Sequence, residues 1–218
     1  MPSLTVRSNR SNGMGLRSVQ FDEPVDGHHA PGQFVQLSAG EIKGYFALAN
    51  DPGTPAELLV KPGGAMADVV AALHTGSTVD STPAIGDGFA MPSGDRPIIM
   101  LVTGSGISAV RPLIRAELSR DTTRPIILYY GVLTPEHRSF SSELEAWESA
   151  GVDVRIVLGE PTEAWQGRRG FVQDAAQEDG LVRSGITLVL CGFPAMVTSA
   201  KEMWGDAGLE AEHMVTNF

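Results

Sequence analysis

Hydrophobic and polar positions follow two different patterns along the chain, and the change comes near residue 91. Before it, short apolar runs are separated by Gly, Pro, Asn and Asp, a spacing typical of a small antiparallel β-barrel. The expected strands cover residues 4–9, 15–22, 33–38, 44–50, 56–62 and 77–82. One short helix, expected at residues 66–74, interrupts them and would lie across one opening of the barrel.

After a linker at residues 91–95, strands and helices alternate. This alternation predicts right-handed crossovers and a parallel sheet of five strands. The strands are expected at 97–103, 125–131, 152–158, 187–191 and 211–217, and the helices at 107–119, 138–150, 171–178 and 195–207. The predicted fold class is therefore β plus α/β. An N-terminal barrel domain covers residues 1–93, and a C-terminal α/β nucleotide-binding domain covers residues 94–218.

Composition narrows the function classes. The 218-residue chain has a formal net charge of −10, which argues against a nucleic acid as partner. Its one cysteine excludes a disulfide framework, a cysteine-ligated iron–sulfur cluster and a structural zinc site within this chain, and the five histidines lack metal-ligand spacing, so we expect no metal. No apolar stretch approaches the roughly 18 residues of a spanning helix, and no secretory signal is evident. We expect a cytoplasmic protein without a membrane span, and organelle import stays open.

Two strands of the second half end in glycine-containing turns. Residues 103–107 (Thr-Gly-Ser-Gly-Ile) follow one strand and open a helix, where backbone N–H groups can approach a pyrophosphate. Cys191 and Gly192 end another strand. Because ligands of open α/β sheets lie at the carboxyl ends of the strands, the pair indicates a dinucleotide site. Each feature also has a structural interpretation when taken alone. Residues 103–107 could form only a tight turn, and Cys191 could be a small buried apolar residue.

Two further stretches also have both a ligand-binding and a structural interpretation. Residues 130–131 (Tyr-Gly) end the second strand of the α/β half, where an adenosine ribose is expected. Arg138, which follows, is either a ligand of a 2′-phosphate or a surface charge in the first turn of a helix. In the barrel half, residues 60–66 (Val-Lys-Pro-Gly-Gly-Ala-Met) form either an anion site or a plain strand–helix turn.

Taken together, these motifs resemble those of the ferredoxin–NADP reductase superfamily over essentially the whole chain. The matching stretches are PGQFV at 31–35, TGSGIS at 103–108, YG at 130–131, CGFPAM at 191–196 and NF at 217–218. Stretches similar to the plant branch, that of the kiwi fruit protein, are FALAN at 46–50, IGDGF at 85–89 and EAWESAGV at 145–152. Single motifs are loose, but five in this order are specific.

The resemblance implies an FAD-binding barrel followed by an NAD(P)-binding domain, with hydride passing from the nicotinamide of NAD(P)H to the flavin. Cys191 would line the nicotinamide pocket, and Phe218 would cover the flavin or yield its place to nicotinamide. The residues implied to bind the cofactors are Phe46, Ala47, Leu48, Ala49, Val60, Lys61, Gly63, Gly64, Ala65, Met66, Thr103, Gly104, Ser105, Gly106, Ile107, Tyr130, Gly131, Arg138, Gly192, Phe193, Pro194 and Met196.

The flavin motif departs from the family pattern R-x-Y-S. Gly44 replaces the arginine that pairs with the FAD pyrophosphate, unless Lys43 reaches that group, and Ala47 replaces the serine that faces the flavin N5. A lost charge-assisted hydrogen bond is worth about 1.5–3 kcal/mol, so weaker FAD binding is expected. Three hypotheses follow: an FAD-dependent NAD(P)H oxidoreductase with a separate electron acceptor, a reductase subunit of a larger complex, and a non-catalytic nucleotide-binding or interaction protein. The sequence leaves open the choice of NADH or NADPH, the acceptor and the oligomeric state.

Overall fold

The computed structural model describes residues 2–120 and 124–217. Contacts divide this part of the chain into two compact units. The first comprises residues 2–89, 108–116 and 217, and the second comprises residues 90–107, 117–120 and 124–216. The domain boundary expected at residues 93 and 94 stays a prediction. Within the described ranges, no helix combines the length and the apolar character needed to cross a membrane.

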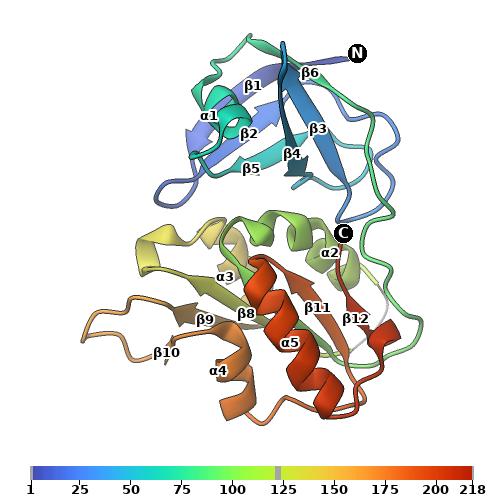
Figure 1. Cartoon of the computed structure of the whole chain (residues 1–218), viewed down its shortest axis with the longest axis vertical. Coiled ribbons are helices and arrows are strands. Elements are labelled where there is room, and N and C mark those ends of the chain that lie inside the picture. The colour runs from blue at the N-terminus through green and yellow to red at the C-terminus, as the bar shows by residue number, and fades with distance from the viewer. Residues whose placement is uncertain (1, 121–123, 218) are drawn as a thin grey trace. The chain divides into compact units, whose positions relative to one another are not determined.

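The first unit contains an antiparallel sheet of six strands, as the spacing of its short apolar runs predicts (Figure 1). They are β1 (Ser3–Ser11), β2 (Arg17–Phe21), β3 (Phe34–Ala39), β4 (Ile42–Ala47), β5 (Glu57–Val60) and β6 (Thr78–Ser81), in the order β4-β3-β6-β1-β2-β5. A bridge between Leu48 and Leu58 joins the segments that follow β4 and begin β5, so the sheet closes into a barrel. The short helix α1 (Ala65–Ala72) confirms the expected helix and places Met66 and Val70 in the barrel core.

The motif at residues 31–35 holds the barrel together. Gln33 is almost fully buried, and its side-chain oxygen accepts hydrogen bonds from the backbone N–H groups of His29 (2.8 Å) and Ala30 (3.0 Å). Its amide nitrogen donates to the carbonyl of Gly86 at 2.9 Å. Gln33 therefore satisfies backbone groups of two loops at once, and the motif has a structural function in this chain.

The second unit is built around a parallel sheet of six strands in the order β10-β9-β8-β7-β11-β12 (Figure 1). The strands are β7 (Ile98–Thr103), β8 (Ile126–Val132), β9 (Asp153–Leu158), β10 (Arg168–Arg169), β11 (Thr187–Cys191) and β12 (Met214–Val215). Its helices are α3 (Ser141–Ser149), α4 (Val172–Glu178) and α5 (Pro194–Asp206), with single 3-10 turns η1 (Gly104–Gly106), η2 (Pro135–His137) and η3 (Ala211–His213). The helix α2 (Ile107–Leu118) follows η1 along the chain, and its residues 108–116 belong to the first unit.

Two details of the predicted sheet were wrong. The sheet has six strands instead of five, because β10 pairs with β9 through two arginines that carry no apolar pattern. The last expected strand, residues 211–217, is strand only at β12, because η3 occupies its first three residues.

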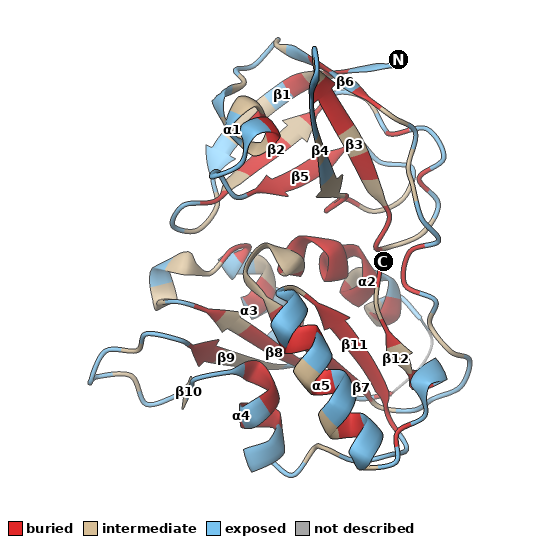
Figure 2. Cartoon of the chain, in the orientation of Figure 1, coloured by how far each residue is buried: buried red, intermediate tan, exposed pale blue. Residues whose placement is uncertain are grey.

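Burial in the second unit is that of a parallel sheet covered by helices (Figure 2). β11 is buried at every position and β7 at every position except Thr103, as expected for central strands of a parallel sheet. α5 begins with Pro194, which is favoured at the first helical position. Its buried residues Met196, Val197, Ala200 and Trp204 form one stripe in the same core cluster as α4.

Candidate functional site

The strand order of the second unit places a topological switch between β7 and β11. From β7 the chain continues to β8, β9 and β10 on one side, and then returns to β11 and β12 on the other side of β7. Cys191, the last residue of β11, lies beside Val102 of β7. In doubly wound sheets, ligands bind outside the carboxyl ends of the strands at such a switch. The turn η1 and the end of β11 therefore form the candidate nucleotide site.

Two glycines allow these strand ends to approach each other closely. A Cβ on Gly106 would lie 2.7 Å from the carbonyl oxygen of Cys191. A Cβ on Gly192, whose φ is +144°, would lie 2.0 Å from Thr103 Oγ1. The same Thr103 hydroxyl accepts a hydrogen bond from the Phe193 N–H at 3.0 Å. Glycine is therefore required at both positions, because any larger residue would push the two strand ends apart.

The Cys191 thiol is buried at this edge. Burial raises its pKa to about 12, so the side chain is a neutral thiol at physiological pH. Because the thiolate is the nucleophilic form of cysteine, the site does not favour attack by Cys191. A neutral, compact side chain suits a residue that lines a binding site, which is the position the resemblance implies.

Tyr130 and Gly131 meet different surroundings at the end of β8. Tyr130 is fully buried, and its hydroxyl accepts a hydrogen bond from the Ser139 N–H at 3.3 Å; burial raises its pKa. Gly131 lies beside Thr103, and a Cβ on it would come within 2.8 Å of Val172 Cγ1. The Tyr130 side chain thus packs inside the unit, and Gly131 lies at the strand end.

Arg138 lies in the turn after η2. It is half-buried, and its Nε donates to the Pro135 carbonyl at 3.0 Å. Beside it, Glu136 is exposed, and its Oε2 accepts a hydrogen bond from Thr134 Oγ1 at 2.5 Å. The sequence analysis singled out Arg138 and missed Glu136, although an acidic residue shortly after the second strand of a dinucleotide-binding unit is an established signal.

In the first unit, β4 carries the altered flavin motif. A Cβ on Gly44 would lie 2.8 Å from Met66 Cβ, so α1 packs on the position at which the family has arginine. Tyr45 is 65% exposed and packs its ring edge-to-face on Phe34, with centroids 5.8 Å apart. Phe46 is half-buried against the barrel core. The strand offers aromatic surface to a planar ring, but no cation at position 44.

The N-terminus of α1 already holds a carboxylate from its own helix. The Gly63 N–H donates to Asp68 Oδ1 at 2.7 Å, and Gly64 is the N-cap residue. Gly63, Gly64 and Ala65 are exposed, as is Lys61. Asp68 was not predicted; it lies four residues after Gly64 in the first turn of α1, where a negative charge is favoured by the helix dipole.

These observations test whether the implied cofactors fit the described residues. The second unit fits a nicotinamide dinucleotide, because a Cβ at Gly106 or Gly192 would clash and the strand ends converge at the switch. The barrel fits a flavin ring through Tyr45 and Phe46. Its anion position is occupied by Asp68, so it fits a diphosphate less well.

The remaining predicted site residues fall into three groups. Leu48, Ala49, Val60, Met66, Ile107 and Met196 are buried in the cores of their units. Ala47, Thr103, Gly104, Ser105, Gly106 and Gly192 are half-buried, and Phe193 and Pro194 are exposed. Phe218 lies outside the described residues. The assignment of all these residues to cofactor binding stays a prediction.

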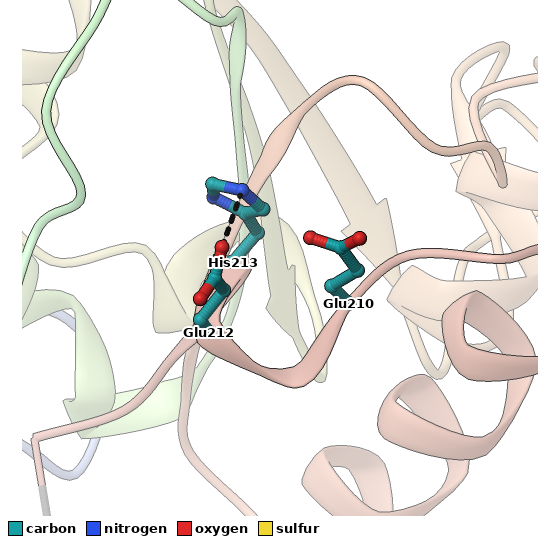
Figure 3. A group of neighbouring side chains, drawn as sticks. All are labelled: Glu210, Glu212 and His213. Atoms are coloured by element: carbon teal, nitrogen blue, oxygen red, sulfur yellow. Dashed lines mark ion pairs between the residues drawn. The ribbon is translucent and has the colours of Figure 1, made fainter.

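One cluster of potential metal ligands occurs among the described residues, at Glu210, Glu212 and His213 (Figure 3). One potential ligand atom from each lies within 4.8 Å of the others. His213 is buried, and its Nε2 lies 3.5 Å from Glu212 Oε1, whereas both glutamates are exposed. Exposed acidic groups commonly adopt such an arrangement without an ion, so the geometry assigns no metal here.

Comparisons with known proteins agree with this geometry. Residues 100–202 match the family model for the oxidoreductase NAD-binding domain. The chain is 31% identical to fruit protein pKIWI502 of Actinidia deliciosa, over 85% of this chain and 65% of that protein. It is 28% identical to ferredoxin–NADP reductase B of Sorangium cellulosum, over 91% of this chain and 89% of that protein.

The fold has a close counterpart among solved structures. A ferredoxin NADP⁺ reductase from Neisseria gonorrhoeae, determined with bound FAD and NADP, superposes with a TM-score of 0.80 at 19% identity. The alignment covers 100% of this chain and 98% of that one. An antiparallel barrel unit, a parallel nucleotide-binding unit and the order of the motifs agree across sequence and structure. The chain is therefore similar in sequence to ferredoxin–NADP reductase B and shares the fold of a solved ferredoxin NADP⁺ reductase.

Proposed function

We propose that the protein is an FAD-dependent NAD(P)H oxidoreductase that passes electrons to a separate acceptor. The observation that carries the proposal is the convergence of η1 and the end of β11 at the switch between β7 and β11, where Gly106 and Gly192 leave no room for a side chain. That arrangement, in a chain with this fold, is the backbone cradle of a nicotinamide dinucleotide.

When bound, the nicotinamide supplies a hydride and the flavin accepts it. The protein's contribution is to bind and orient the reacting rings. Backbone N–H groups of residues 104–106 would bind the diphosphate, and Cys191 would provide a neutral surface beside the nicotinamide. Thr103 fixes the backbone at Phe193 through its hydroxyl. Tyr45 and Phe46 of β4 present the aromatic surface for the flavin ring.

The acceptor is a separate molecule in this proposal. The chain's one cysteine provides no cysteine-ligated iron–sulfur cluster. The Sorangium relative is named a ferredoxin–NADP reductase, and a ferredoxin-type protein is accordingly the class of acceptor to test first. Assignment of Phe218 and the α1 turn to cofactor binding is part of the same proposal.

Absorption spectroscopy tests the proposal directly. The purified chain, after incubation with FAD and removal of unbound FAD, should show the absorption bands of an oxidised flavin. Addition of NADH or NADPH in the absence of oxygen should bleach these bands. Phe46→Ala should weaken FAD binding, whereas Ile42→Ala, an exposed apolar residue on the same strand, should leave it unchanged. A chain that retains no added FAD, or a bound flavin that neither nucleotide reduces, would contradict the proposal.

A second candidate function is favoured by the first unit. Met66 fills the space beside Gly44, and Asp68 occupies the anion position at α1. Both features weaken a diphosphate site, so a nucleotide-binding or interaction protein without flavin is the alternative. It predicts that NAD(P)⁺ binds while added FAD does not.

A further inference from the structure

The turn at residues 133–138 borders the candidate nucleotide site on the β8 side. Gly131 lies beside Thr103, the residue that precedes the glycine turn η1. Pairing with the β9 segment continues past the end of β8, since the Glu160 N–H donates to the Leu133 carbonyl at 2.8 Å. In doubly wound sheets, the adenosine ribose lies at the end of the strand next to the phosphate turn. Residues 133–138 are therefore placed to contact its 2′ position.

Glu136 gives this turn a fixed negative charge. The side chain is exposed, and Thr134 Oγ1 donates a hydrogen bond to its carboxylate. This hydrogen bond is the largest cause of a pKa below the usual value of 4.5, and the charges of His137 and Arg138 act in the same direction. Glu136 is thus ionised at neutral pH. A carboxylate here can accept a hydrogen bond from a ribose 2′-hydroxyl, but it repels a 2′-phosphate.

Arg138, the cation of the same turn, is directed to its own backbone. Its Nε donates to the Pro135 carbonyl at 3.0 Å. His137, the remaining titratable group of the turn, lies 2.9 Å from Thr134 Oγ1 through Nδ1. Each of these two side chains therefore uses one nitrogen within the turn itself.

The arginines on the neighbouring strands are also engaged. Arg155 and Arg168 each bind Asp179 at 2.7 Å, and Arg168 makes a second bond to the same carboxylate at 2.9 Å. Arg169 donates to the Trp165 carbonyl at 2.5 Å. A 2′-phosphate at the β8 end would therefore meet the Glu136 carboxylate and arginines that already have other partners.

We propose that residues 133–138 select NADH over NADPH, with the Glu136 carboxylate as the acceptor for the 2′-hydroxyl of the adenosine ribose. This inference rests on the proposed function, because it names the coenzyme of the same site. It concerns binding by the second unit, and flavin is not needed to test it.

Titration calorimetry of the intact chain with NAD⁺ and NADP⁺ tests the inference without any redox step. Wild-type protein should bind NAD⁺ at least about tenfold more tightly than NADP⁺, a difference of about 1.4 kcal/mol. Glu136→Gln should bring the two affinities together, mainly by improving NADP⁺ binding. Glu148→Gln, the same change at an exposed position of α3, should keep the wild-type ratio. Arg138→Ala should also keep it.

Each other result overturns the inference. Tighter NADP⁺ binding by the wild type, lost in Arg138→Ala, would make Arg138 the phosphate ligand and leave the proposed oxidoreductase function intact. Equal affinities that Glu136→Gln does not change would remove Glu136 from the ribose site. Failure to bind either nucleotide would overturn this inference and the proposed function together. Since Glu136 is exposed, circular dichroism of the variant should match that of the wild type.

Discussion

Substitution of Gly192 by alanine tests whether the two strand ends are as close as the structure places them. The new Cβ would lie 2.0 Å from Thr103 Oγ1 and 2.9 Å from the Thr103 backbone nitrogen. Both distances are below any normal carbon contact, so β7, β11 or both must shift. The φ of +144° adds a second cost, because only glycine adopts this region readily.

The two costs have separate magnitudes. A non-glycine residue in a sparsely populated backbone region costs on the order of 1–3 kcal/mol. Forcing extra atoms into a packed site costs about 1–3 kcal/mol more. We therefore expect Gly192→Ala to lower the free energy of unfolding by about 2–6 kcal/mol, a large fraction of the stability of about 5–15 kcal/mol typical of natural domains. Displacement of Gly192 should also break the Phe193–Thr103 hydrogen bond and weaken NAD⁺ binding.

Urea unfolding, with Gly185→Ala as the matched control, separates the two costs. Gly185 precedes the same strand at φ +76°, and a Cβ added there would meet no atom within 4 Å beyond its chain neighbours, so that variant carries only the backbone cost. Thr103→Ala in the Gly192→Ala background removes the nearest clashing atom and should restore part of the loss. If Gly192→Ala is as stable as Gly185→Ala, or if the double variant recovers nothing, the close approach is refuted.

Three further predictions concern charged groups. Glu57 forms an ion pair with Arg111 at 2.6 Å, and both side chains are at least nine-tenths buried. Glu57→Gln should therefore lower the free energy of unfolding in urea by about 3–5 kcal/mol, because it leaves the Arg111 charge buried without its partner. A decrease below about 1 kcal/mol would contradict this prediction. Burial lowers the pKa of His28 in the folded state, so the free energy of unfolding should fall as the pH drops below about 6.5. His28→Gln should therefore flatten the curve of Tm against pH between pH 7 and pH 5. An unchanged curve would show that His28 does not cause this pH dependence. The hydrogen bond from Arg168 lowers the pKa of Asp179 from 3.8 to about 2, so Asp179 stabilises the fold above pH 4 and loses this effect toward pH 2. Asp179→Asn should have a lower Tm than the wild type at pH 7, and its Tm should fall less between pH 4 and pH 2.

Much of the fold was predictable because it depends on local periodicity. Short apolar runs between turn residues predicted the barrel strands, and the alternation of strands and helices predicted α5. The site edge was predictable for the same reason, since Gly104 and Cys191 follow buried strands whose parallel arrangement brings their ends together. Periodicity says nothing about β10, because Arg168 and Arg169 pair with β9 through their backbones alone.

The details that the sequence analysis missed depend on side chains that meet after folding. Gly44 and Met66 are 22 positions apart, and only the packing of α1 against β4 shows why an arginine has no place at position 44. Likewise, the sequence does not show that Arg138 Nε donates a hydrogen bond to the Pro135 carbonyl. Such competition for hydrogen-bonding partners is settled by geometry, and local sequence carries little trace of it.

The two predicted cofactor sites differ in the residues that they require, so a substitution can affect one site without the other. The predicted nucleotide site uses backbone groups, and Gly106 and Gly192 leave no space there for a side chain. The flavin site of the family depends on an arginine and a serine, and both are substituted in this chain at Gly44 and Ala47. A change at β4 can therefore weaken FAD binding while η1 and the end of β11 keep their geometry, because the two sets of residues belong to different units. It follows that dinucleotide affinity should be the same with and without added FAD, and that loss of flavin by the barrel would leave a chain that still binds its nucleotide.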